Sequence, residues 1–314
     1  MVLGRLASVA FGAGDDDLEP TLTFYRELLG VAEVGRDDDH VFLSGGMTAD
    51  YDVAFGPWPV GLHHFSFYVG GDADLEVAGE RLAATVNVTE VDVAGHPGLR
   101  RALQFPLPSG HLVRLVVATD PIVFQPVPTV DQRHVTGVGP TPLEHISIQC
   151  VDIQQTSEFL VEHLGFAITE ASRQRDEPWF ASFIRTRDLH HDLGIFRAKE
   201  SRLDHFGFTV ESADSLMRFA DLARGLGYFL ACSPGRHIAG NNLFLYIRDP
   251  LGTLVEVGTP MSPIDVAAPT RMFEADTLAE WRGTFDAWRD GIPSDARAGS
   301  PISPAAIAEA SDAA

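Results

Sequence analysis

The chain contains 314 residues, a length that predicts two domains of ordinary size, each with its own hydrophobic core. Hydrophobic residues make up 45% and charged residues 21%, which is typical of a folded globular protein and excludes wholesale disorder and fibrous classes. The 44 acidic residues outnumber the 23 basic ones, and the formal net charge of -21 argues against a nucleic-acid partner.

The N-terminal run from Leu6 to Gly14 is uncharged, and we expect it to form the first β-strand; the alternative is the apolar region of a signal peptide. No stretch reaches 18 uninterrupted apolar residues, so the sequence predicts no membrane-spanning helix and no membrane partner. Cys150 and Cys232 lie far apart without CxxC spacing, which favours buried thiols in a cytoplasmic protein and argues against a thiolate metal site.

Three pairs of similar segments recur along the chain, 137, 141 and 142 residues apart. The pairs are Arg5–Phe11 with Pro142–Ile148, Gly61–Val69 with Arg202–Val210, and Gly110–Leu115 with Gly252–Val257. Such a steady offset indicates a duplicated domain.

Within each copy, an alternating apolar strand leads to a helical pattern and then to short β-rich segments, and this order occurs twice. The helices are expected at Leu18–Leu29, Ala73–Ala84, Gln155–Leu164 and Ala213–Leu226, with C-caps that include Gly30, Gly165 and Gly227. The sequence therefore predicts an α+β protein of two tandem domains, each made of two paired β-α-β-β-β modules.

The expected domain plan follows the repeat. It consists of an N-terminal domain (1–120), a proline-rich linker (121–142), a C-terminal domain (143–260) and an extension (261–314). Within the extension, Leu278–Trp288 is compatible with a short amphipathic helix, while Pro293–Ala314 is rich in Ala, Ser and Pro and is expected to be mobile.

Three polar residues of the second copy occupy strand positions that should point inward: His145, His205 and Glu256. Two imidazoles and one carboxylate form the set that binds one face of a non-haem Fe(II) and leaves positions open for substrate and O₂. Glu256 lies between Val255 and Val257, where a buried carboxylate needs a compensating partner such as a metal ion.

The first copy carries Ser8, His64 and Arg114 at the matching positions. Because a guanidinium cannot ligate a cation and repels it, only the C-terminal domain is expected to hold metal, and the N-terminal domain is expected to be structural. The alternative is a metal-free binding module in which the three residues of the second copy only hydrogen-bond one another.

A gapped motif adds a family resemblance. It runs through Gly235-Arg236-His237, Leu245-Tyr246, Asp249-Pro250, Gly252 and Glu256. This motif resembles the signature of the type I extradiol ring-cleavage dioxygenases, such as catechol 2,3-dioxygenases and dihydroxybiphenyl dioxygenases, of the vicinal oxygen chelate superfamily. The resemblance extends over roughly residues 4 to 260 and implies that the paired modules form open, incomplete barrels.

The resemblance implies roles for individual residues. The metal ligands fall on His145, His205 and Glu256, with Fe(II) as the cofactor and Mn(II) as an alternative. The acid/base histidine falls on His191 or on its neighbour His190; we favour His191 because it precedes an Asp and an aliphatic run. The catalytic set is completed by His237 and Tyr246, which match the histidine and tyrosine that hydrogen-bond substrate or oxygen.

The implied activity is cleavage of a catecholic ring by O₂ beside its two hydroxyl groups, giving a muconic-semialdehyde type of product in aromatic degradation. The resemblance also implies a homo-oligomer. Because one fold supports several chemistries, the rival interpretation is a divalent-metal-dependent isomerase or lyase of the same superfamily.

The substrate is the least determined feature. The expected substrate-binding residues are Phe183, Phe206, His190 and Asp249, and an aromatic wall would favour an alkyl- or aryl-substituted catechol. Ordinary core packing is the competing interpretation for the aromatic residues. By analogy with the family, the segment around Trp281 and Trp288 could cover the pocket as a lid.

Overall fold

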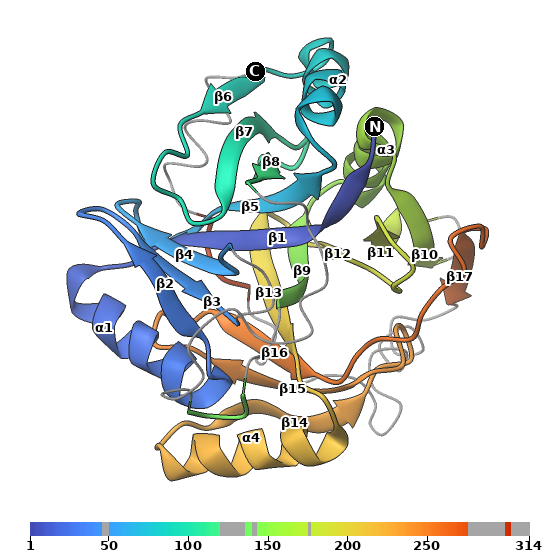
Figure 1. Ribbon diagram of the computed structural model, residues 1–314. Coiled ribbons are helices and arrows are strands. Elements are labelled where there is room, and N and C mark those ends of the chain that lie inside the picture. The colour runs from blue at the N-terminus through green and yellow to red at the C-terminus, as the bar shows by residue number, and fades with distance from the viewer. Residues whose placement is uncertain (46–49, 120–135, 140–142, 175–176, 276–298, 303–314) are drawn as a thin grey trace. The chain divides into compact units, whose positions relative to one another are not determined.

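The computed structural model describes the chain except residues 46–49, 120–135, 140–142, 175–176, 276–298 and 303–314 (Figure 1). The described residues divide into an N-terminal unit, Met1–Leu143 with Pro301 and Ile302, and a C-terminal unit, Glu144–Ser300. Most of the expected linker, the expected helix Leu278–Trp288 with both of its tryptophans, and most of the tail lie outside the described residues.

The N-terminal unit contains two successive β-α-β-β-β modules, as the repeat predicts. The first consists of β1 (Leu3–Gly12), α1 (Asp15–Phe24) with a π-helical turn η1 (Tyr25–Leu29), β2 (Ala32–Arg36), β3 (Val41–Ser44) and β4 (Val53–Gly56). The second consists of β5 (Gly61–Val69), α2 (Asp72–Ala83), β6 (Thr89–Val91), β7 (Leu99–Pro106) and β8 (Leu112–Ala118). The uncharged N-terminal run therefore forms strand β1.

The C-terminal unit repeats the arrangement and adds one strand. Its first module is β9 (Leu143–Cys150), α3 (Ile153–Leu164), β10 (Ala167–Gln174), β11 (Trp179–Arg185) and β12 (Leu193–Arg197). Its second is β13 (Arg202–Thr209), α4 (Ala213–Gly225), β14 (Leu230–Arg236), β15 (Leu243–Arg248) and β16 (Leu254–Gly258). The added strand, β17 (Arg271–Ala275), pairs in parallel with β10 (Figure 1).

Each unit builds one mixed sheet in which the first strands of its two modules are neighbours. The strand order is β2-β3-β4-β1-β5-β8-β7-β6 in the N-terminal unit and β14-β15-β16-β13-β9-β12-β11-β10-β17 in the C-terminal unit. The predicted α+β class and two-domain modular fold are confirmed. Strands β16, β13 and β9 are consecutive at the centre of the second sheet, so residues about 110 positions apart in sequence meet there.

The helices form where the sequence predicts them, with boundaries that differ by a few residues. Asp152 and Ser212 cap α3 and α4, because their side-chain oxygens accept hydrogen bonds from the amides of Gln155 and Ser215. The first predicted helix ends in a π-helical turn rather than a regular α-helix. Among the described residues, no helix is long and apolar enough to cross a membrane.

Candidate active site

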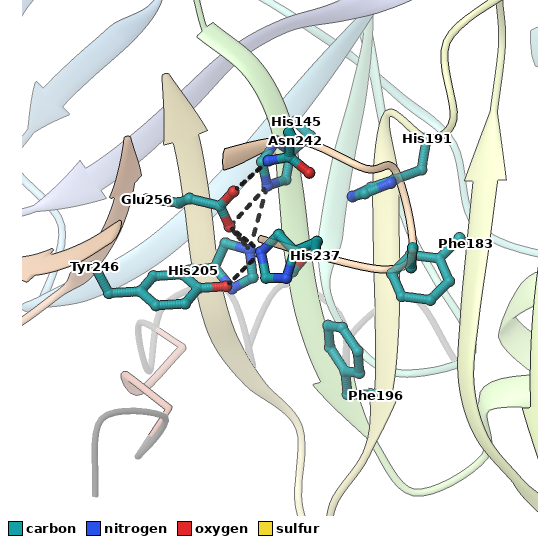
Figure 2. A pocket seen from close by; sticks show the side chains of 11 residues that line it. His145, Phe183, His191, Phe196, His205, His237, Asn242, Tyr246 and Glu256 are labelled. Carbon is teal, nitrogen blue, oxygen red and sulfur yellow. Dashed lines mark hydrogen bonds and ion pairs between the residues drawn. The ribbon is translucent and has the colours of Figure 1, made fainter. Parts of the chain in front are cut away.

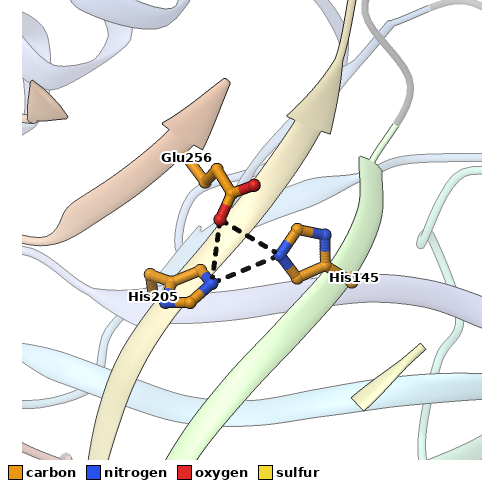
Figure 3. A group of neighbouring side chains, drawn as sticks. All are labelled: His145, His205 and Glu256. Atoms are coloured by element: carbon orange, nitrogen blue, oxygen red, sulfur yellow. Dashed lines mark hydrogen bonds and ion pairs between the residues drawn. The ribbon is translucent and has the colours of Figure 1, made fainter. Parts of the chain in front are cut away.

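His145, His205 and Glu256 converge from three neighbouring strands of the C-terminal unit (Figure 3). The two Nε2 atoms lie 3.2 Å apart, and Oε2 of Glu256 lies 3.2 Å from Nε2 of His205 and 3.7 Å from Nε2 of His145. Donor atoms bound at right angles, about 2.1 Å from a shared ion, would be separated by about 3 Å. The three side chains therefore fit one face of a divalent transition-metal ion, and all three are buried.

Two buried residues orient these side chains. Nδ1 of His205 lies 2.6 Å from Oδ1 of Asp204, so this nitrogen carries the proton and Nε2 keeps its lone pair for a cation. Asn242 donates from Nδ2 to Oε1 of Glu256 at 3.0 Å, which leaves Oε2 facing the two histidines. Nε2 of His205 and Oε2 of Glu256 thus present lone pairs toward a point that Nε2 of His145 also faces.

The electrostatics of these three residues also favour a cation. Burial raises the pKa of Glu256, but the charge of His237 and hydrogen bonds from His145, His205 and His237 hold it well below its usual range. Burial lowers the pKa of His145, whereas the carboxylates of Glu144 and Glu256 raise it, to about 9. A fixed carboxylate surrounded by imidazoles thus attracts positive charge, which protons or a metal ion can supply.

A pocket opens beside the three residues (Figure 2). Its walls are formed by His145, Ser147, Phe183, His191, Phe196, His205, His237, Ala239, Asn242, Tyr246 and Glu256. The rings of Phe183 and Phe196 meet edge to face with centroids 5.8 Å apart and form an apolar side. The pocket therefore places polar groups beside an apolar wall, an arrangement that small-ligand sites commonly have.

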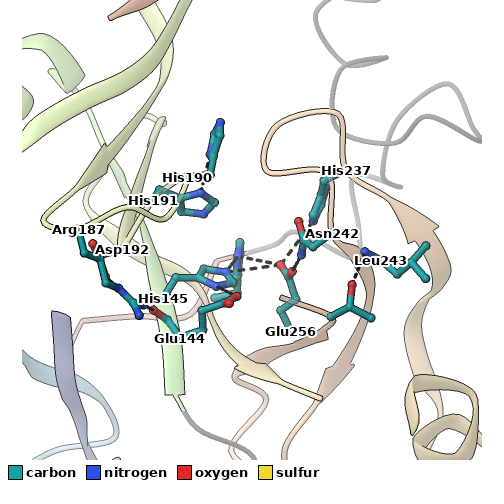
Figure 4. Close-up of polar contacts among 12 residues, drawn as sticks. Glu144, His145, Arg187, His190, His191, Asp192, His237, Asn242, Leu243 and Glu256 are labelled. Atoms are coloured by element: carbon teal, nitrogen blue, oxygen red, sulfur yellow. Dashed lines mark hydrogen bonds and ion pairs between the residues drawn. The ribbon is translucent and has the colours of Figure 1, made fainter. Parts of the chain in front are cut away.

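His191 lies on the cavity wall, with its ring centroid 5.0 Å from that of His145. Asp192, which is fully buried, accepts hydrogen bonds from the backbone amide of Thr186 and from Nε of Arg187, and this fixes the turn that carries His191 (Figure 4). Burial and the neighbouring His145 and His190 hold the pKa of His191 well below its usual value, so the imidazole is neutral.

His237 and Tyr246 lie on the opposite side of the same donor set. Nε2 of His237 is 3.5 Å from the hydroxyl of Tyr246 and 3.5 Å from Oε2 of Glu256. The imidazole of His237 stacks on Phe244 with centroids 3.7 Å apart, which fixes its plane. Both polar groups can therefore reach a ligand that contacts the three converging residues.

Three of the expected substrate-binding residues do not line the cavity. Phe206 follows His205 on β13, and because successive strand residues point to opposite faces, its ring packs against Phe208. Asp249 is part of a turn, where its Oδ1 accepts a hydrogen bond from the amide of Thr253. His190 is buried behind His191, with their Nδ1 atoms 3.0 Å apart. Of that group only Phe183 contacts the cavity.

The first copy replaces the donor set at the same sheet positions. Glu256 is paired with Gly207 and Tyr246 across the strands, and Arg114 is paired in the same way with Ser66 and Gln104. Nε of Arg114 donates to Oε1 of Gln104 at 2.8 Å. A cation therefore occupies the place of the carboxylate. Among the described residues, only the C-terminal unit contains a group of three potential metal ligands.

Sequence reasoning missed several residues that shape the site: Ser147, Phe196, Asp204 and Asn242. The alternation of strand residues could have identified Ser147, because it lies two positions after His145 on the same face of β9. No sequence signal identified Asn242, whose position follows from the turn between β14 and β15.

Comparison with known proteins shows which proteins this chain resembles. Residues 143–257 match the profile of the Glyoxalase/Bleomycin resistance protein/Dioxygenase superfamily. Homoprotocatechuate 2,3-dioxygenase from Arthrobacter globiformis shares the fold with a TM-score of 0.82 at 20% identity, over 96% of this chain and 92% of that one. The Mn(II)-bound glyoxalase from Novosphingobium aromaticivorans has a TM-score of 0.79 at 20% identity, over 96% of each chain.

Curated relatives narrow the resemblance. A manganese-dependent 2,3-dihydroxybiphenyl 1,2-dioxygenase from Geobacillus genomosp. 3 is 23% identical over 246 residues, which is 74% of this chain and 78% of the relative. A metapyrocatechase from Pseudomonas sp. (strain CF600) is 26% identical over 251 residues, 77% of this chain and 81% of the relative. The predicted resemblance to extradiol dioxygenases of the vicinal oxygen chelate superfamily is confirmed.

Proposed function

We propose that the protein is an extradiol dioxygenase that cleaves a catecholic ring with O₂ at a single Fe(II) or Mn(II) ion. The observation that carries the proposal is the convergence of His145, His205 and Glu256 beside a cavity that also contains His191, His237 and Tyr246. Curated relatives named as dihydroxybiphenyl dioxygenase and metapyrocatechase support the ring-cleaving reaction over an isomerase or lyase.

The metal ion would be held by Nε2 of His145, Nε2 of His205 and Oε2 of Glu256. The chemistry that such an ion supplies is simultaneous binding of both catechol oxygens and O₂, with electron transfer from the ring to oxygen. The carboxylate gives the three-residue set one negative charge, so the protein neutralises part of the cation's charge and leaves part to attract an ionised catechol oxygen.

His191 is the proposed acid/base residue. Its Nδ1 faces His190 at 3.0 Å, so Nε2 is the nitrogen free to exchange a proton with the ligand in the cavity. The neutral imidazole can accept a proton from a substrate hydroxyl and return it when the oxygen-oxygen bond breaks. His237 and Tyr246 would hydrogen-bond the reacting oxygens from the other side, since their polar atoms converge 3.5 Å apart.

The cavity supports an uncharged, apolar catechol as substrate. Its described lining contains no Lys or Arg that could pair with a substrate carboxylate, whereas Phe183, Phe196 and Ala239 form an apolar cluster beside the polar groups. An alkyl or aryl substituent would bury apolar area there, at a gain of about 25 cal/mol per Å². We therefore expect alkylcatechols and arylcatechols to be better substrates than 3,4-dihydroxyphenylacetate.

The decisive experiment is anaerobic reconstitution with Fe(II) or Mn(II), followed by O₂ uptake and absorbance scans with a panel of catechols. Oxygen consumption together with a yellow ring-fission product is the expected result. Full metal occupancy with no O₂ uptake for any diphenol would contradict the proposal and favour the isomerase or lyase alternative.

We also propose that the protein is cytoplasmic and homo-oligomeric. We propose no nucleic-acid or membrane partner. These proposals are supported by the reduced cysteine pattern, the family resemblance and the net charge of -21. Sedimentation of the purified protein as a monomer would contradict the expected homo-oligomer.

A further inference from the structure

Asn242, which hydrogen-bonds Oε1 of Glu256, is not one of the residues of the motif that predicted the site. Asn242 lies in the turn between β14 and β15 and is 2% exposed, as is Glu256. Its Nδ2 donates to Oε1 of Glu256 at 3.0 Å, while Oε2 alone faces His145 and His205 (Figure 2). The two oxygens of the carboxylate therefore have different partners.

The backbone of the turn places Asn242 with little freedom. The preceding residue, Asn241, adopts the left-handed conformation with φ of 58°, and the amide of His237 donates to the carbonyl of Asn242 at 3.0 Å. On β16, Gly258 leaves the space that the pair needs, since a Cβ there would lie 3.0 Å from Nδ2 of Asn242 and 3.3 Å from Oε1 of Glu256. The contact is thus supported from two strands.

The chemistry fixes the orientation of the amide. With the opposite orientation, the amide oxygen would lie against the carboxylate oxygen, and two acceptors would repel each other. In the observed orientation, Oδ1 of Asn242 is buried and has no hydrogen-bond partner among the described residues. A buried acceptor without a partner costs free energy. Since the fold leaves Oδ1 without a partner and pairs Nδ2 with Glu256, it uses this side chain as a hydrogen-bond donor.

The first copy carries no such pair. The 142-residue offset places Arg100 at the position of Asn242 and Arg114 at the position of Glu256. Arg100 is on the exposed side of β7, where it pairs with Asp72, and Arg114 is held by Gln104 instead. The asparagine and the carboxylate therefore occur together in the copy that has the histidines.

We propose that Asn242 is a positioning residue that makes Glu256 a one-oxygen ligand. The inference rests on the proposed metal centre and concerns how it is built. With Oε1 occupied by Nδ2, only Oε2 can bind the cation, so the carboxylate takes one coordination position and leaves the others for a substrate that binds through two oxygens and for O₂. Without this hydrogen bond, both oxygens of Glu256 are free to bind and to close a position that the substrate needs.

The test uses Mn(II) binding to the apoprotein and infrared difference spectra with ¹³C-labelled glutamate, so it does not depend on turnover. In wild-type protein, binding of one Mn(II) should produce the wide separation of carboxylate stretching bands that marks one-oxygen binding. Asn242→Ala should weaken Mn(II) binding about 10–100-fold, as loss of a hydrogen bond to a metal ligand typically does, and should narrow the separation. Asn241→Gly, which keeps the turn conformation, is the matched control and should behave as wild type.

Each outcome decides the inference. A two-oxygen carboxylate signature in wild-type protein overturns it, and this measurement decides the matter even if Asn242→Ala does not fold. Unchanged bands together with Mn(II) affinity within about twofold of wild type in Asn242→Ala also overturn it. If wild-type protein binds no Mn(II) or Fe(II), the proposed metal centre itself fails, which is a different result from a bound ion with the wrong carboxylate signature.

Discussion

Gly207 lies against the imidazole of His145, and a Cβ atom at Gly207 would be 2.2 Å from Cε1 of that ring. Gly207 is on β13, two residues after His205 and therefore on the same face of the strand. The first copy has Ser66 at this position, where the residue matching His145 is the small Ser8. The imidazole of His145 on β9 therefore fits only if the residue at position 207 on the neighbouring strand β13 has no side chain.

Gly207→Ala should displace His145 and weaken Mn(II) binding at least tenfold, because one imidazole of the donor set leaves its position. The measurement is a Mn(II) titration of folded apoprotein, with thermal unfolding recorded in parallel. Ser66→Ala is the matched control in the first copy and should bind Mn(II) as wild type does. Equal affinity in Gly207→Ala and wild type would show that His145 does not ligate the ion.

Glu256→Gln should reduce metal affinity by more than the 10–100-fold typical of residues that only support a ligand, because it removes the single negative charge of the set. Metal content after gel filtration measures the effect. Glu170→Gln on β10 is a carboxylate control in the same unit and should retain full occupancy. Full occupancy in Glu256→Gln would exclude this carboxylate as a ligand.

His191→Phe should keep its metal and lower kcat by about 10²–10⁴-fold, since it removes the acid/base group without touching the donor set. His190→Phe should lower kcat less than tenfold, because His190 is behind the cavity wall. Stopped-flow turnover with measured metal content separates the two variants. A larger loss in His190→Phe than in His191→Phe would assign the acid/base role to the other histidine.

Arg114→Ala should lower the free energy of unfolding by about 1–3 kcal/mol, because the buried Gln104 loses a charged hydrogen-bond partner. Turnover and metal content of the folded variant should equal those of wild type, since the N-terminal unit is expected to be structural. Urea unfolding measures the loss of stability, and O₂ uptake measures whether turnover is unchanged. Loss of activity in a fully folded Arg114→Ala would contradict the structural role of the first copy.

The thiol of Cys150 should resist alkylation in the native protein. It is fully buried, and burial raises its pKa to about 11, so the reactive thiolate is scarce at pH 8. Mass spectrometry after brief iodoacetamide treatment measures the modification at Cys150, with urea-unfolded protein as the positive control. Rapid alkylation of the folded protein would show that the core around β9 opens readily.

Local signals in the sequence predicted much of the fold. The repeat offset indicated the duplication, and hydrophobic periodicity with glycine C-caps predicted the four helices and the strands of each copy. These signals can be read from the sequence because they depend only on residues that are close along the chain. The alternation of side chains along a strand would also have excluded Phe206 from the cavity, since Phe206 directly follows the inward-pointing His205. The spacing of His190 and His191 left two candidates, and the structure places only His191 on the cavity wall.

The sequence by itself determined that two copies of a β-α-β-β-β pair exist and that the second carries two histidines and one glutamate on inward strand positions. Only the tertiary structure decided which side chains support them, because sheet register and turn geometry bring Asp204, Gly207 and Asn242 into place. Those contacts join strands far apart in the chain, and no local pattern records them. These contacts affect stability because they are buried: each buried polar atom needs a hydrogen-bond partner, and each ring needs space in a close-packed interior.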